Sequence, residues 1–60
     1  MSELLDVAQA CDYLGGIHRA TLYREIKRGV LTVVKVRGST RLRRSELDRY
    51  LRSRELRATA

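Results

Sequence analysis

Residues 5–29, LDVAQACDYLGGIHRATLYREIKRG, decide the fold, because they predict two short helices separated by a glycine turn. Asp6 precedes Gln9 by three residues, a spacing at which the two side chains satisfy the free amides of a helix start. Apolar residues then recur on one helical face: Val7, Ala10, Cys11 and Leu14. Gly15-Gly16 ends the helix, since glycine adopts the left-handed cap conformation without steric cost. The segment therefore begins with one short amphipathic helix.

The second helix of this segment is expected to start near His18 or Arg19 and to end at Gly29. Leu22 and Ile26 lie about one turn apart, so they predict its buried stripe. The opposite face holds a small residue and three bases: Ala20, Arg24, Lys27 and Arg28. Two short helices joined by a glycine turn, the second one basic on its outer face, indicate a helix-turn-helix.

Residues 33–43 predict a β-hairpin with its turn at Gly38-Ser39. A two-residue loop at that dipeptide would pair Val36 with Arg41 and put the arginine on the apolar face. Shifting the register by one residue pairs Val36 with Leu42 instead, so that two apolar side chains share a face. We therefore expect this second register, with a loop of about three residues.

The expected register has an electrostatic consequence on the outer face of the hairpin. It opposes Arg37 to Arg41 and Lys35 to Arg43, and like charges placed directly opposite each other are destabilising. These residues can be read as solvated side chains on an exposed strand. We favour the alternative that phosphates neutralise them in a functional complex, because the neighbouring helix is basic as well.

A third helix is expected to open at Ser45, with acids in its first turn, where they suit the helix dipole. Its apolar stripe is formed by Leu47, Tyr50 and Leu51. Arg43-Arg44 directly precedes the helix N-terminus, which is an unfavourable place for positive charge. This again indicates an external anion.

The order helix, helix, two-stranded hairpin and helix defines a small α+β winged helix-turn-helix. We expect one domain over residues 1–60, with an ordered core over 4–55 and a frayed tail over 57–60. A domain of this length has little room for a deep substrate cavity in addition to its core.

The charge distribution predicts the kind of partner. The chain has 13 Lys and Arg against seven Asp and Glu, a net charge of +6. Every base lies at position 19 or later, whereas the first 18 residues hold three acids and no Lys or Arg. A mildly acidic start followed by a strongly basic remainder indicates a polyanionic partner.

Catalytic and metal-binding groups are too few for an enzyme. The single cysteine, Cys11, lies on an apolar helix face and is expected to be buried, and the single histidine, His18, lies on a different element. No carboxylate pair or glycine-rich phosphate loop accompanies them. We expect no enzymatic activity, metal, cofactor or small-molecule ligand. No apolar run approaches the ~18–20 residues of a membrane span, so we expect a cytoplasmic protein with no membrane partner.

Duplex DNA is the polyanion that this arrangement fits, because a helix enters the major groove, where base edges are readable. The recognition-helix candidates are Arg19, Ala20, Tyr23, Arg24, Lys27 and Arg28. The wing candidates are Lys35, Arg37, Ser39, Thr40, Arg41 and Arg43. Additional backbone contacts are expected from His18, Thr21 and Arg44. Arg24 is the best candidate for base readout, since arginine takes guanine O6 and N7 together. Whether Tyr23 packs at the core edge or contacts a phosphate stays open.

These pieces together resemble the excisionase-type, MerR-like winged-helix DNA-binding domains, from about Leu4 to Leu51. The matching pieces are Asp6-Val7-Ala8-Gln9-Ala10, Tyr13-Leu14-Gly15, Arg19-Ala20-Thr21-Leu22-Tyr23-Arg24-Glu25-Ile26, Arg28-Gly29 with Leu31, Val34-Lys35-Val36 with Gly38, Arg41-Leu42, Arg43-Arg44-Ser45-Glu46-Leu47-Asp48 and Tyr50-Leu51. The chain departs from the common pattern in a helix-to-helix turn, Gly15-Gly16-Ile17-His18, that is one residue longer, and in Thr40, where many members carry an aromatic residue.

The resemblance implies a phage excisionase, which is a recombination directionality factor. Such proteins bind repeated attachment sites on double-stranded DNA, often cooperatively with other copies of themselves. They bend the DNA and so direct a tyrosine integrase toward excision, in the bacterial host cytoplasm at the nucleoid. The resemblance carries the family's recognition helix onto Arg19–Arg28 and its wing onto Arg37–Arg41.

Two other functions fit the sequence. A phage or plasmid transcriptional repressor would use the same fold and the same surface. The chain ends soon after the third helix, with no long dimerisation helix, which argues against an inducer-responsive activator. An RNA- or ribosome-associated basic protein is less favoured, because the strands carry no interleaved aromatic residues for base stacking.

Overall fold

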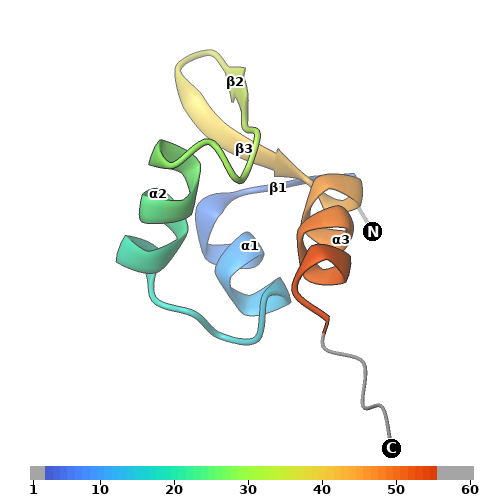
Figure 1. Ribbon diagram of the computed structural model, residues 1–60. Coiled ribbons are helices and arrows are strands. Elements are labelled where there is room, and N and C mark those ends of the chain that lie inside the picture. Colours follow the sequence, from blue (N-terminus) through green and yellow to red (C-terminus); the bar gives the residue numbers. More distant parts are fainter. Residues whose placement is uncertain (1–2, 56–60) are drawn as a thin grey trace, which may run out of the picture.

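The computed structural model describes residues 3–55, which form three helices and a three-stranded antiparallel sheet. In chain order the elements are β1 (Leu4–Leu5), α1 (Val7–Tyr13), α2 (Arg19–Lys27), β2 (Val34–Val36), β3 (Ser39–Arg43) and α3 (Arg44–Ser53). The helices gather on one side of the sheet, and the β2–β3 hairpin projects away from them (Figure 1). The predicted α+β winged helix-turn-helix is confirmed. The frayed tail expected over 57–60 lies outside the described residues.

Helix α1 starts and ends where the local sequence predicts. The Asp6 carboxylate accepts a hydrogen bond from the Gln9 amide at 2.8 Å, and Gln9 Oε1 accepts one from the Asp6 amide at 3.0 Å. This is the complete capping box expected from the spacing. At the other end, Gly15 and Gly16 have φ of 93° and 81°, in the left-handed region that glycine adopts most easily.

Helix α2 begins at Arg19, with His18 as its N-cap residue. Nδ1 of the imidazole accepts a hydrogen bond from the Ala20 amide at 3.0 Å, so the histidine fills the capping role that serine or aspartate usually takes. Leu22 is completely buried and Ile26 packs against the core, as the stripe predicts. The basic residues on the opposite face are exposed.

The hydrophobic core contains side chains from the helices and from the sheet. Its completely buried large side chains are Leu22 of α2, Leu42 of β3 and Leu47 of α3. Complete burial of a leucine side chain stabilises a fold by about 1.5–3 kcal/mol, so these three residues tie the recognition helix, the wing and the last helix together. Cys11 is buried beside them as a free thiol, as expected.

The register expected for the hairpin is wrong. Val36 pairs with Ser39 rather than with Leu42, and the loop consists of two residues, Arg37 and Gly38. Both loop residues have positive φ, 52° and 81° respectively. Positive φ at both central positions is the geometry of a type I′ turn, whose twist matches that of the flanking strands. The sequence predicted Gly38 as the first residue of the turn, whereas in the structure Gly38 is the second and Arg37 is the first.

The like-charge pairs that followed from the expected register are therefore absent. Neither Arg37 with Arg41 nor Lys35 with Arg43 is a cross-strand pair. Lys35 instead lies opposite Thr40 and donates a hydrogen bond from Nζ to the threonine Oγ1 at 2.7 Å. Opposed like charges on the hairpin therefore give no indication of phosphate binding.

Strand β1 was not predicted. Leu4 pairs with Arg43 and Leu5 with Leu42, which makes β3 the central strand in the order β1-β3-β2. Two residues are too few to show a strand period, and their partner lies far along the chain. The extra strand buries Leu5 against Leu42 and closes the sheet over α1.

Helix α3 starts earlier than predicted and is capped from a distance. Its N-cap residue is Arg43, which makes no side-chain capping hydrogen bond, and Ser45 lies inside the first turn. The Glu3 carboxylate accepts hydrogen bonds from Ser45 Oγ at 2.7 Å and from the Ser45 amide at 3.4 Å. The serine hydroxyl is the main cause of the lowered pKa of Glu3. An internal acid therefore sits at this positive helix end, where an external anion had been expected.

Arg37 is the non-glycine residue with positive φ among those described. Replacing it with asparagine, which tolerates this conformation and favours type I′ turns before glycine, should stabilise the fold by about 1 kcal/mol. For a domain of this size the melting temperature would rise by about 4–8 °C. Lys35→Asn removes the same charge from the same hairpin at an extended position and should give no such increase. Equal melting temperatures for the two variants would contradict the strain at Arg37.

Candidate nucleic-acid interface

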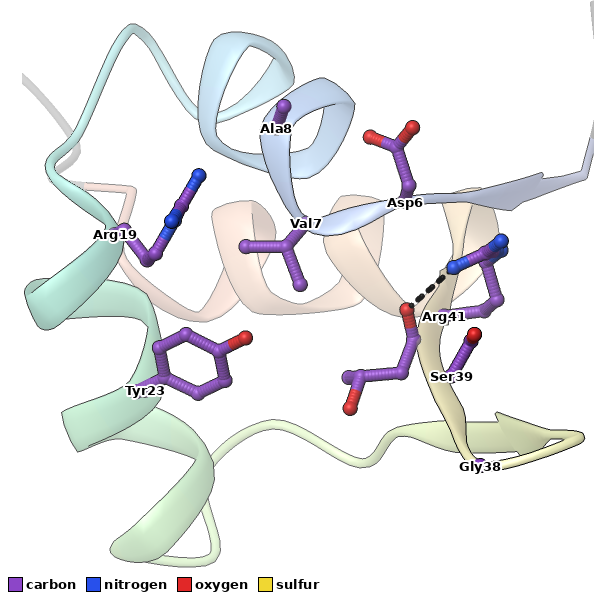
Figure 2. A pocket seen from close by; sticks show the side chains of 9 residues that line it. Asp6, Val7, Ala8, Arg19, Tyr23, Gly38, Ser39 and Arg41 are labelled. Atoms are coloured by element: carbon purple, nitrogen blue, oxygen red, sulfur yellow. Dashed lines mark hydrogen bonds between the residues drawn. The ribbon is translucent and has the colours of Figure 1, made fainter.

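A groove of about 460 Å³ lies between α2 and the hairpin, with the start of α1 at its end. It is lined by Asp6, Val7, Ala8, Arg19, Tyr23, Gly38, Ser39, Thr40 and Arg41. Figure 2 shows Arg19 and Tyr23 reaching in from α2, with Ser39 and Arg41 on the opposite wall. The fold thus brings together the recognition-helix and wing candidates that the sequence separates.

The two walls carry groups that bind anions. Arg41 Nη1 donates a hydrogen bond to the Thr40 carbonyl at 3.1 Å, which fixes the guanidinium and leaves its other donors for a ligand (Figure 2). Tyr23 is 45% exposed, and its hydroxyl has no hydrogen-bond partner among residues 3–55. Arg19 is exposed at the first turn of α2. The Asp6 carboxylate at the groove is already engaged in capping α1. The arrangement suits a phosphodiester backbone.

The outer face of α2 continues from this groove as a basic surface. Ala20, Arg24 and Lys27 are all exposed there. Alanine leaves room for close approach, and the two long cations flank it on the same helix face. The structure therefore places the candidates for base readout next to the groove.

Ion pairing divides the basic residues into two groups. In the part of the chain that the structure describes, the salt bridges are Arg28–Glu25, Arg49–Glu46 and Arg54–Glu25. The groove and hairpin bases form no salt bridge with a described residue: Arg19, Arg24, Lys27, Lys35, Arg37, Arg41 and Arg43. These bases therefore remain available to a polyanion, although the Asp6 carboxylate also lines the groove.

Several predicted site residues lie away from the groove. Arg28 is paired with Glu25, Nη1 to Oε2 at 2.9 Å, although 60% of its side chain is exposed. Arg43 and Arg44 lie at the end of β3 and the start of α3, at the opposite end of β3 from the turn. His18 is engaged in capping, and Thr21 is half-buried.

Sequence reasoning missed a buried acid on the recognition helix. The Glu25 side chain is 8% exposed, and its carboxylate accepts hydrogen bonds from the Tyr50 hydroxyl, Arg54 and Arg28 at 2.8, 2.6 and 2.9 Å. The hydrogen bond that the Tyr50 hydroxyl donates is the largest cause of the lowered pKa of the Glu25 carboxyl. The i,i+3 spacing from Glu25 to Arg28 was the local signal available for it.

A second acid supports the segment that leads to the wing. Glu46 Oε2 accepts a hydrogen bond from the Thr32 amide at 2.9 Å and pairs with Arg49 at 2.7 Å. Arg49 also donates to the Val30 carbonyl at 2.8 Å. Residues on α3 therefore hold the connection between α2 and β2.

These features define a winged helix-turn-helix DNA-binding domain. The sequence profile of a family described as a helix-turn-helix domain matches residues 4–55, and the chain belongs to this family. The family includes excisionase-like DNA-binding proteins. No curated protein and no solved structure matches the chain. Within residues 3–55 no helix is long and apolar enough to cross a membrane.

The lowered pKa of Glu25 predicts how stability depends on pH. The pKa of the Glu25 carboxyl in the folded protein lies below its ordinary value of 4.5. The ionised carboxylate therefore stabilises the fold above pH 4.5, and this stabilisation is lost as the pH falls through the folded-state pKa. Glu25→Gln removes this titration, so the variant should be less stable at neutral pH and lose less stability between about pH 5 and pH 3. Denaturant unfolding at each pH measures both effects.

Glu55→Gln is the matched control, because it removes the same charge from an exposed acid outside the helices. It should follow the wild-type dependence on pH. If Glu25→Gln lost as much unfolding free energy on acidification as the wild type, the Glu25 carboxylate would gain no stabilisation from its three partners.

Proposed function

We propose that this protein is an architectural DNA-binding protein that acts as an excisionase. It binds repeated attachment sites on duplex DNA, bends the DNA and directs a tyrosine integrase toward excision. The observation that carries the proposal is the groove between α2 and the hairpin, flanked by bases that form no salt bridge with a described residue. Membership of a family that includes excisionase-like proteins supports the role.

In the proposed complex α2 enters the major groove, which accommodates a helix. The adjacent sugar-phosphate strand then runs through the groove of the protein, where Arg19, Tyr23 and Arg41 donate hydrogen bonds to phosphate oxygens. These contacts fix the register of the protein on the duplex. The exposure of Tyr23 supports phosphate contact over packing at the core edge.

Base readout is assigned to the exposed face of α2. Arg24 reaches guanine O6 and N7 together, and Lys27 contacts an acceptor one turn further along the helix. Ala20 allows the helix to approach closely and contacts a thymine methyl. Specificity therefore comes from α2, whereas the groove supplies affinity.

The hairpin tip is the part that acts on DNA shape. Arg37 stands at its apex, next to Gly38, and is exposed. A cation presented at the tip of a wing fits a narrow minor groove, where the negative potential is strongest. With α2 in the major groove and Arg37 in the minor groove, the protein contacts one DNA strand from both grooves. These contacts favour a bent duplex.

The proposed partners follow from this role. They are attachment-site DNA, further copies of the protein on adjacent repeats, and the tyrosine integrase, in the cytoplasm of the bacterial host at the nucleoid. The deciding test is excision in a reconstituted reaction with the integrase and host factors. Excision that proceeds equally without this protein would reject the excisionase role and favour the repressor that shares this fold.

Two substitutions separate base readout from backbone binding. Arg24→Ala should cost about 1–3 kcal/mol on the preferred duplex and little on random duplex, because it removes a base contact. Arg41→Ala should weaken binding to both duplexes and reduce the salt slope by about 1, because it removes a phosphate contact. Each variant is the other's control in titrations at several salt concentrations. A uniform loss for Arg24→Ala, or an unchanged slope for Arg41→Ala, contradicts the assigned role.

A further inference from the structure

Glu25 of α2 is hydrogen-bonded to Tyr50 of α3 and to Arg54, the C-cap residue of that helix. Glu25 Oε1 accepts hydrogen bonds from the Tyr50 hydroxyl at 2.8 Å and from Arg54 Nη2 at 2.6 Å. The Arg54 guanidinium lies over the Tyr50 ring, 5.0 Å from its centroid, so the two donors also hold each other. Both hydrogen bonds thus end on the same carboxylate oxygen of α2, one from α3 and one from its C-cap residue.

The other contacts of α2 are apolar and set its rotation less directionally than hydrogen bonds do. Helix α2 packs mainly on α1, and α3 packs mainly on α1 and β3. The core contacts of α2 are aliphatic, from Leu22 and Ile26, and such contacts are not directional. Hydrogen bonds to a buried carboxylate are directional and charge-assisted. Glu25 therefore adds a directional restraint on how α2 is turned about its axis.

The rotation of α2 matters because Glu25 follows Arg24 directly in the helix. Fixing the direction of one side chain fixes its neighbour at about 100° around the axis. Binding constellations must be held within about 10–20° of the productive geometry to be effective. The contacts at Glu25 thus decide where Arg24 points.

We propose that Tyr50, supported by Arg54, is a positioning residue for DNA readout: it orients the recognition helix through Glu25 without touching DNA itself. This inference rests on the proposed function, in which α2 reads base edges. The expected effect of losing this contact is on sequence preference and not on overall DNA affinity. Loss of the Tyr50 hydroxyl lowers the preference for the cognate sequence, while backbone binding through Arg19 and Arg41 persists.

The structure contains a matched control. The Tyr13 hydroxyl donates a hydrogen bond to Asp48 at 2.5 Å, a second part-buried tyrosine–carboxylate pair that ends on α3. Burial and then the hydrogen bond to Glu25 raise the pKa of Tyr50, and the hydrogen bond to Asp48 and then burial raise that of Tyr13, so the two pairs are chemically alike. Tyr13 lies on α1, however, and its bond joins α1 to α3 without involving α2.

The experiment compares Tyr50→Phe with Tyr13→Phe. The probes are the duplex that the wild-type protein enriches from a random-sequence pool and a random duplex of the same length. Tyr50→Phe should lower the affinity ratio between the two about tenfold, with an unchanged salt slope on the random duplex. Tyr13→Phe should keep the wild-type ratio at a similar loss of thermal stability. Equal ratios for the two variants would overturn the inference.

A second pair covers the case in which Tyr50→Phe does not fold. Arg54→Met keeps the aliphatic stem and removes the donors to Glu25, whereas Arg52→Met removes an exposed arginine of the same helix that has no salt bridge among residues 3–55. Arg54→Met should lower the affinity ratio and Arg52→Met should not. A wild-type protein that enriches no duplex from the pool would reject the proposed function itself, before any variant is compared.

Discussion

The burial of Leu42 in the middle of β3 is the constraint on which the DNA-binding surface depends. Leu42 is completely buried and lies opposite Leu5 of β1. Because side chains alternate along a strand, an inward Leu42 directs Arg41 and Arg43 to the other face. A slip of one residue would bury Arg41 and expose the leucine, which loses the apolar burial and leaves a charge in the core. Burial of Leu42 therefore fixes which face of β3 the neighbouring Arg41 occupies in the groove wall.

Positive charge in this domain serves two purposes, and the structure separates them. Arg49 and Arg54 pair with Glu46 and Glu25, where α3 meets the wing connection and the recognition helix. Bases at the groove and hairpin have no such partners within residues 3–55, so their mutual repulsion persists in the free protein. A polyanion relieves this repulsion on binding. Residues of α3 and its C-cap thus pair with acids that hold α2 and the connection to β2, while the bases of the groove and hairpin remain outside these salt bridges.

The sequence predicted the elements whose signals are local, and it failed where distant residues decide. The capping box at Asp6 and the buried stripe through Leu22 and Ile26 were confirmed. The hairpin register was wrong, because Gly38 permits a turn with glycine in either central position. The choice between them depends on the twist of the strands and on Leu42 reaching the core. Strand β1 was missed, since it forms by pairing with β3 near the other end of the chain.

The sequence by itself determined the fold class, the order of helices and hairpin, and the basic outer face of α2. Caps, glycine stops and helical periodicity act over about three to four residues, so they are readable without a structure. Only the tertiary structure decided that Arg54 pairs with Glu25, how the hairpin is registered and where α3 is capped. Those features join Glu3 to Ser45 and Glu25 to Arg54, separated by 42 and 29 residues. Side chains so far apart in the sequence meet only because the buried leucines bring their helices and strands together.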